Sequence, residues 1–212
     1  MKSKLEPPKL PQNLPVLSRE LYSLQTKDEF SQGSIEDIVI DGQEATKVSF
    51  DQFVFRNVTI MESTLMQSEF IDVIFEKCDL SNVNFTDSII HRAEFINCKL
   101  IGTDFTRSRF QNVRFQSCMS DYATFRFANF KQVYFENCAL NRADFYHSTV
   151  QKLSFGTCKM DEAILSGTQL SGIDLSDCEF DSLRVEIEDL KGCIISASQA
   201  SSFAGLLGLL IK

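Results

Sequence analysis

The chain has 212 residues, of which 43% are hydrophobic and 24% charged, a composition that suits one folded unit and excludes a disordered chain. No stretch approaches the roughly eighteen apolar residues of a membrane span, and no apolar run follows the N-terminal lysines as in a secretory signal. We therefore expect a cytoplasmic protein, without membrane contact, whose seven cysteines stay reduced. The formal net charge of −8 argues against a nucleic-acid ligand and favours a basic partner.

The first 33 residues differ in character from the rest of the chain. The stretch KLEPPKLPQNLP is rich in proline, which favours extended backbone. A chain that stacks as successive coils exposes unpaired backbone groups at each end and needs a cap there. We expect residues 1–33 to form the N-terminal cap.

From Phe50 to Ile195 the sequence repeats every five residues. Of the thirty positions at this spacing, twenty-nine carry Phe, Leu, Ile, Val or Met, and only Ser120 is polar. A second column, two residues earlier, holds mostly Ala, Ser, Thr, Val or Cys, and the other three positions hold nearly all the charged and amide side chains. Neither the helical period of about 3.6 nor the strand period of about 2 matches this rhythm.

Four such repeats form a longer period of twenty residues. The cysteines mark it: they recur at Cys78, Cys98, Cys118, Cys138, Cys158 and Cys178. Corresponding sides of a four-sided coil would then stack, with large side chains on the axis and small ones in the tighter corners. At the strand spacing of about 4.8 Å per coil, the repeats predict a rod roughly 35 Å long.

The repeats resemble those of the pentapeptide-repeat family. AEFIN at residues 93–97, ADFYH at 143–147 and SRFQN at 108–112 match the family's pattern, and the resemblance covers about 150 of the 212 residues. It implies an all-β fold, a right-handed quadrilateral β-helix, which we assign to residues 34–197.

Catalytic and metal-binding chemistry has little support in the sequence. His91 and His147 lie at outward positions, and no HExxH, GxSxG or phosphate loop occurs. The cysteines form a linear ladder, whereas zinc needs four converging ligands. We expect them to pack as small apolar side chains, in a protein that is not an enzyme and holds no metal or other cofactor.

Residues 198–212 form an apolar tail, predicted as a C-terminal α-helix with Ser198 as a possible N-cap. It is more apolar than a capping helix requires, so we expect it to join two copies in a homodimer, with a simple cap as the alternative. The predicted dimer interface is Phe203, Leu206, Leu207, Leu210 and Ile211.

The ending LKGCIISASQASSFAGLLGLLI, residues 190–211, resembles the C-terminus of the Qnr quinolone-resistance proteins and their mycobacterial relatives. This resemblance implies a dimer that is joined through its C-terminal helix and binds DNA gyrase and topoisomerase IV as a mimic of duplex DNA. Many Qnr proteins carry loops that project from the coil, whereas here the five-residue register runs without insertion from Phe50 to Ile195.

Charge is distributed unevenly along the repeats. Residues 101–157 carry four acidic and seven basic side chains, whereas residues 158–212 carry nine acidic and four basic ones. A DNA mimic needs outward carboxylates that basic DNA-binding grooves can meet, although a solvated acidic surface is the plainer alternative. The predicted topoisomerase-binding surface is Asp161, Glu162, Asp174, Asp177, Glu179, Asp181 and Glu186.

The resemblance and the charge pattern together predict a DNA-mimicking protein that binds DNA gyrase and topoisomerase IV and protects them from quinolones or modulates their activity. Two alternatives stay open, because a fold does not fix a function. One is a structural scaffold or adaptor, and the other is an immunity factor against a gyrase-directed toxin.

Overall fold

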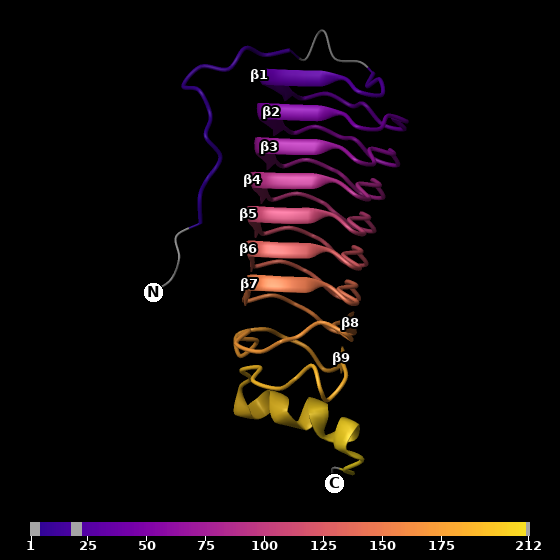
Figure 1. The fold of residues 1–212 in the computed structure, drawn as a ribbon, viewed down its shortest axis with the longest axis vertical. Coiled ribbons are helices and arrows are strands. Elements are labelled where there is room, and N and C mark those ends of the chain that lie inside the picture. The colour runs from indigo at the N-terminus through magenta and orange to yellow at the C-terminus, as the bar shows by residue number, and fades with distance from the viewer. Residues whose placement is uncertain (1–4, 18–22, 211–212) are drawn as a thin grey trace.

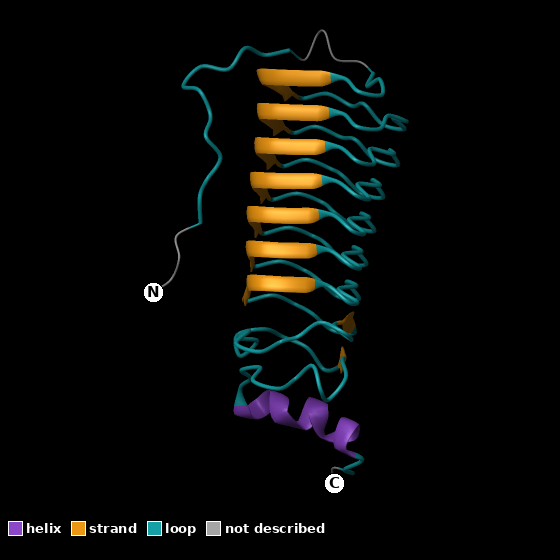
Figure 2. Cartoon of the chain, in the orientation of Figure 1, coloured by secondary structure: helices purple, strands orange, loops and turns teal. Residues whose placement is uncertain are grey.

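The structure, a computed structural model, describes residues 5–17 and 23–210. Its body is the right-handed quadrilateral β-helix that the five-residue pattern predicts (Figure 1). Seven parallel strands follow one another along the rod, and each residue pairs with the one twenty positions later, as Phe115 does with Phe135. A 3₁₀ helix lies beyond the last coil (Figure 2). The elements are β1 (Glu29–Glu36), β2 (Ser49–Arg56), β3 (Glu69–Glu76), β4 (Ile89–Ile96), β5 (Arg109–Gln116), β6 (Asn129–Glu136), β7 (Thr149–Gly156), β8 (Ala163–Ile164), β9 (Leu183–Arg184) and η1 (Ala197–Leu207).

Each coil has four faces of five residues, which we call A, B, C and D. In the coil of residues 128–147, face A is 128–132, face B 133–137, face C 138–142 and face D 143–147; other coils follow at intervals of twenty. The strands β1 to β7 span faces A and B, while faces C and D are joined from coil to coil mainly by single bridges such as Asn84 to Asp104.

The corners between faces share one backbone conformation. Every fifth residue from Lys27 to Gly172 has a positive φ, between 49° and 79°, and only four of these thirty residues are glycine. This left-handed conformation is uncommon for residues with a side chain, and Asn and Asp tolerate it best. The unbroken run ends at Gly172, since Asp177 and Ser182 at the next two corners do not adopt this conformation, and among the later corners that the structure describes it recurs only at Gly192. The side-chain pattern therefore continues further than the regular backbone does.

Phenylalanine rings fill the axis of the rod in stacked ladders. Phe115 and Phe135 stack with ring centroids 4.5 Å apart and an interplanar angle of 4°. The facing ladder meets them edge-on, since Phe125 lies 5.7 Å from Phe135 at 80°. Such offset and edge-to-face contacts are the favourable geometries for aromatic pairs. The large column is thus a continuous aromatic core.

The thiols and hydroxyls of the small inward column donate hydrogen bonds to backbone carbonyl oxygens. The thiol of Cys98 donates to the carbonyl oxygen of Phe75 at 3.3 Å, and the hydroxyl of Ser108 donates to that of Phe85 at 2.8 Å. Each acceptor lies 23 residues earlier in the chain. Buried polar groups need such partners, which explains why Cys, Ser and Thr suit this column. The same bond recurs at Cys78, Thr103, Cys118, Cys138, Ser148, Cys158 and Thr168.

Ser120 departs from both columns. It occupies an axis position between Leu100 and Leu140, is fully buried, and its hydroxyl has no hydrogen-bond partner among the described residues. A buried hydroxyl without a partner destabilises the folded state.

Residues 5–17, which we call the N-terminal strap, pass from the first coil down the side of the rod (Figure 1). Near β1, the amide of Leu17 donates to the carbonyl of Ser34 at 2.7 Å. Further along, the amide of Lys9 donates to Asp72 Oδ1 on β3 at 2.8 Å. Asp72 in turn pairs with Arg92 of β4, with Nε and Oδ1 2.6 Å apart. The strap therefore bonds to β1 and β3, and Asp72 connects it to β4.

The strap also lies over outward apolar side chains of face B. A hollow of about 500 Å³ is lined by Leu10 and Leu14 of the strap and by Val54 and Ile74 of the coil. Apolar residues at these outward positions would otherwise meet water, so the proline-rich segment has a packing role.

The C-terminal helix differs from the predicted α-helix in type and start. It is a 3₁₀ helix that begins at Ala197, with Ser196 rather than Ser198 as its N-cap. Gln199 explains this start, because its Oε1 accepts a hydrogen bond from the Ser196 amide at 2.8 Å. The three serines and one glycine within ASQASSFAGLL have weak intrinsic preference for the α-helix.

Gln199 also fastens the helix to the last regular coil. Its Nε2 donates to the carbonyl oxygens of Leu175 and Cys178, at 2.8 and 2.7 Å. No further coil follows that could donate hydrogen bonds to these carbonyls, and Gln199 does so instead. Across residues 5–17 and 23–210, no helix is long and apolar enough to cross a membrane.

Candidate partner-binding surface

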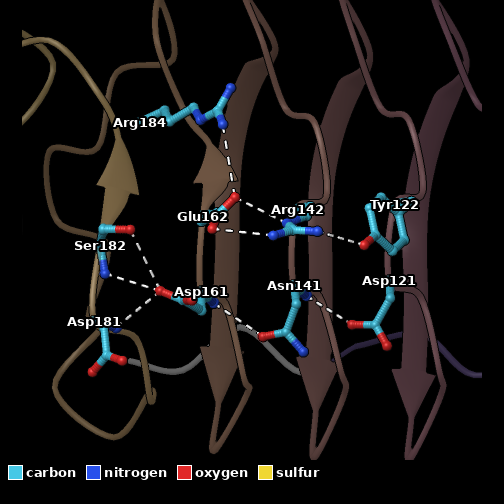
Figure 3. Close-up of polar contacts among 9 residues, drawn as sticks. All are labelled: Asp121, Tyr122, Asn141, Arg142, Asp161, Glu162, Asp181, Ser182 and Arg184. Atoms are coloured by element: carbon cyan, nitrogen blue, oxygen red, sulfur yellow. Dashed lines mark hydrogen bonds and ion pairs between the residues drawn. The ribbon is translucent and has the colours of Figure 1, made fainter.

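The structure divides the predicted acidic surface among three faces. Asp161, Glu162, Glu179 and Asp181 lie together on face C of two successive coils, and we call them the C-face carboxylates (Figure 3 shows three of them). Asp174 and Asp177 fall on face B and Glu186 on face D. Four of the seven predicted residues are therefore brought together, and three are not.

Asp161 is held by the backbone of the next coil. Its Oδ1 accepts hydrogen bonds from the amides of Asp181 and Ser182, at 3.1 and 3.0 Å (Figure 3). These bonds hold the pKa of Asp161 below its usual range, with the Ser182 amide as the largest cause. The preceding coils repeat the contact, since Asn141 Oδ1 accepts from the Asp161 amide and Asp121 Oδ1 from the Asn141 amide. Asp161 thus belongs to a structural Asp/Asn ladder.

Glu162 is clamped by arginine. Arg142 donates from Nε and Nη2 to its two carboxylate oxygens, at 2.9 and 3.2 Å, and Arg184 Nη2 lies 3.7 Å from Oε2 (Figure 3). The hydrogen bond from Arg142 lowers the pKa of Glu162. Its charge is therefore largely neutralised within the protein.

Glu179 and Asp181 carry the less compensated charge of face C. Both are exposed, and neither carboxylate has an ion pair within 4 Å in the part of the chain that the structure describes. They line a shallow hollow of about 230 Å³ with Lys159 and Asn141. Asp177 and Glu186 are exposed on the neighbouring faces. The carboxylates available to a partner are these, rather than Asp161 and Glu162.

The contacts that divide the carboxylates could be read from the sequence only in part. Asp121, Asn141, Asp161 and Asp181 recur at twenty-residue spacing, a signal for a ladder along one side of the rod. The clamp on Glu162 has the same spacing from Arg142, but a surface side chain at that distance has many alternative orientations. Sequence reasoning missed both roles.

The predicted dimer interface is also divided. Phe203 is 9% exposed and packs edge-on against Phe180 of the last coil, with ring centroids 5.9 Å apart. It therefore packs the helix onto its own chain, and its place in a dimer interface stays a prediction. Leu206 and Leu210 are exposed, as is Leu209 beside them. Leu207 belongs to the helix, and Ile211 lies outside the described residues.

The cysteines and histidines were considered in the sequence as possible metal ligands. Among residues 5–17 and 23–210, no group of His, Cys, Asp and Glu side chains is placed to hold a metal ion. The six cysteines of the ladder are buried, and burial raises the pKa of the Cys178 thiol to about 11. His91 lies beside Arg92, with Nε2 and Nη1 2.9 Å apart, and burial followed by the Arg92 charge lowers its pKa.

Comparisons with known proteins place these features in a family. The family model for the pentapeptide repeat region matches residues 88–165, and no curated protein matches the chain. Among solved structures, a trypsin-treated variant of QnrB1, a plasmid-mediated fluoroquinolone resistance protein, is 21% identical; the match covers 85% of this chain and 100% of that chain, with a TM-score of 0.47.

A second solved structure is HetL, a pentapeptide repeat protein involved in heterocyst differentiation regulation from the cyanobacterium Nostoc sp. strain PCC 7120. It is 14% identical over 84% of this chain and 86% of its own, with a TM-score of 0.37. Residues 88–165 therefore belong to a pentapeptide repeat region, and the five-residue sequence pattern and the parallel β-helix continue on both sides of them.

Proposed function

We propose that this protein is a DNA mimic that acts in the cytoplasm, binds DNA gyrase and topoisomerase IV, and protects them from quinolones or modulates their activity. The observation that carries the proposal is the cluster of C-face carboxylates near the C-terminal end of a rod. Glu179 and Asp181 are its outward charges, and residues 158–212 contain nine acidic against four basic side chains. The mode of action is binding, without catalysis or a cofactor.

The physical basis is electrostatic. An enzyme that binds duplex DNA presents a basic groove to a regular array of phosphates. A rod whose coils repeat about every 4.8 Å can hold carboxylates at regular intervals along such a groove. Asp161 holds the backbone amides of Asp181 and Ser182, which limits the backbone entropy that this segment loses on binding.

Dimerisation through the C-terminal helix belongs to the same proposal. Leu206 is 37% exposed, Leu209 58% and Leu210 94%, so the end of the helix and the two leucines after it present an apolar surface to water, although Phe203 is buried. A second copy that covers these leucines would bring two sets of C-face carboxylates toward the centre of a longer rod.

Binding to purified gyrase holoenzyme tests the electrostatic proposal. We expect Glu179→Gln/Asp181→Asn to weaken binding at least about tenfold and to reduce its dependence on salt. Asp161→Asn is the matched control, because Asn141 already accepts the equivalent amide hydrogen bond one coil earlier. Glu29→Gln/Glu69→Gln removes two exposed charges from face A and controls for net charge. Equal binding by all three variants and the unaltered protein would refute the role of face C.

Light scattering tests the dimer. Leu206→Ser/Leu210→Ser should convert a dimer to a monomer while keeping the Phe203 and Gln199 contacts that hold the helix on its coil. A dimer that persists in this variant would place the interface elsewhere.

A further inference from the structure

Two aromatic side chains occupy corners where the chain otherwise places polar residues. Among the thirty corner residues from Lys27 to Gly172, Phe127 is the single wholly apolar one and Tyr122 the single tyrosine. Both have a positive φ, 57° and 60°, which is strained for bulky side chains. They are 51% and 54% exposed. Half-exposed aromatic side chains on strained corners are typical of a binding surface rather than of the fold.

The two corners bound face D of one coil, and further aromatic and cationic groups lie around them. His147 stacks on Phe127, with centroids 6.0 Å apart and an interplanar angle of 5°. Tyr146 meets Phe127 edge-on at 5.8 Å and carries the guanidinium of Arg126 over its ring at 5.1 Å. We call this group the aromatic patch: Tyr122, Arg126, Phe127, Arg142, Tyr146 and His147.

The next coil leaves room for the patch. Gly167 follows His147 on the same corner column, and a Cβ added to Gly167 would lie 2.6 Å from the His147 ring. Glycine therefore allows the imidazole to lie close over the backbone, beside Phe127. The rings of the patch are therefore held in a defined arrangement by one another and by the space over Gly167.

The aromatic patch is continuous with the C-face carboxylates. Arg142 Nη1 donates to the Tyr122 hydroxyl at 2.7 Å, while its Nε donates to Glu162 Oε2 at 2.9 Å (Figure 3). Arg142 therefore links Glu162 of face C to Tyr122 of the aromatic patch. A specific protein interface covers about 800 Å² on each partner, more than a few carboxylates supply, so a partner on face C would reach this corner.

We infer that the topoisomerase contact continues from face C across face D, and that Tyr146 on face D and Phe127 at its far corner form the apolar anchor. This inference rests on the proposed function and assigns that partner a second kind of contact. The topoisomerase would offer a protein surface with an apolar side chain or pocket beside carboxylates, which suit the half-exposed guanidinium groups of Arg126 and Arg142. Tyr, Arg and other aromatic residues are the side chains that most often dominate binding energy at interfaces.

Charge favours a protein over a nucleic acid on this patch. Arg126 pairs with Asp144 at 3.5 Å and Arg142 with Glu162, so the local guanidinium groups are already partly neutralised. The net charge of −8 and the nearby carboxylates would repel a long polyanion. A folded protein can instead place a few carboxylates where they match.

Binding kinetics with purified gyrase holoenzyme test the inference. We expect Phe127→Ser/Tyr146→Ser to weaken binding at least about tenfold, chiefly through faster dissociation, with the salt dependence unchanged. Glu179→Gln/Asp181→Asn should instead slow association and reduce the salt dependence. Tyr134→Ser, an outward aromatic change on face B, is the matched control and should bind as the unaltered protein does. Circular dichroism checks that each variant keeps the fold.

The outcomes separate the two proposals. Unchanged gyrase binding by Phe127→Ser/Tyr146→Ser, with weaker binding by the carboxylate variant, would overturn the aromatic anchor and leave the proposed function standing. No gyrase binding by the unaltered protein would remove both. A parallel arm uses a fluorescent single-stranded 20-mer: binding that requires Phe127 and Tyr146 would reassign the patch to nucleic acid.

Discussion

Phe125 and Phe127 show how position alone decides what a phenylalanine does in this coil. They are two residues apart, yet Phe125 is fully buried between Phe105 and Phe145, with centroid distances of 5.3 and 4.9 Å, while Phe127 is 51% exposed. The five-residue pattern separates them directly, because one occupies the large inward column and the other a corner. The sequence therefore distinguishes a core ring from a surface ring without a structure.

Truncating these two rings should have very different effects on stability. We expect Phe125→Ala to lower the free energy of unfolding by about 3–5 kcal/mol, since it leaves a cavity in a stacked core. Phe127→Ala, the matched control, should change it by less than about 0.5 kcal/mol. Urea unfolding followed by circular dichroism measures both. Equal unfolding midpoints would mean that the assigned register is wrong.

Two buried serines should respond in opposite directions. Ser120 has an unsatisfied hydroxyl on the axis, so Ser120→Leu should raise stability by roughly 1–3 kcal/mol if Leu fits as it does at Leu100 and Leu140. The hydroxyl of Ser148 donates to Phe125 O at 2.6 Å, so Ser148→Ala should lower stability by about 1 kcal/mol. Thermal unfolding of both variants is the test, and a loss of stability in Ser120→Leu would show that the site is already filled.

Among the elements, the sequence predicted the coils and a C-terminal helix, but not the conformation of the corners or the docking of the strap. The five-residue spacing of apolar side chains shows which residues point inward, so the register of β1 to β7 could be predicted from the sequence. The left-handed corners could not, because outward residues such as Arg107 or Lys152 give no sign of a positive φ. The docking of the strap was not predicted either, because it depends on a part-buried hydrogen bond from the Lys9 amide to Asp72, 63 residues away. Such contacts between distant segments leave no local periodicity.

Acidification should release the N-terminal strap in two stages. His91 has a lowered pKa, so the stability it contributes is present above its unfolded pKa of about 6.5 and is lost as the pH falls below that value. The pKa of Asp72 is also lowered: burial raises it, but the hydrogen bonds from Arg92 and Lys9 outweigh burial. Its contribution is present above about pH 3.9 and is lost as the pH falls through the lowered value.

Hydrogen exchange of the Lys9 amide, corrected for intrinsic rates, measures this release. Protection should fall between pH 7 and pH 5 and fall further below pH 4. Asp72→Asn should reduce protection already at pH 7, because it removes the ion pair with Arg92, whereas Glu69→Gln on the same strand should not. Protection that is unchanged by Asp72→Asn would show that this contact does not hold the strap.

At the scale of the whole molecule, one regular scaffold carries different surfaces along its length. Residues 101–157 carry seven basic and four acidic side chains and include the whole aromatic patch, whereas residues 158–212 carry nine acidic and four basic ones. The sequence predicted this division of charge. It did not predict which carboxylates remain available, because pairing of Glu162 with Arg142 and of Asp161 with backbone amides depends on side-chain orientation.

The most direct test of the account is DNA supercoiling by purified gyrase, with and without ciprofloxacin, in the presence of micromolar protein. The account predicts that the protein inhibits supercoiling or restores it in the presence of the drug, that Asp161→Asn does the same, and that Glu179→Gln/Asp181→Asn loses most of the effect. A protein that leaves supercoiling unchanged in both conditions, and shows no binding to gyrase or topoisomerase IV, would contradict the account and favour a scaffold or adaptor.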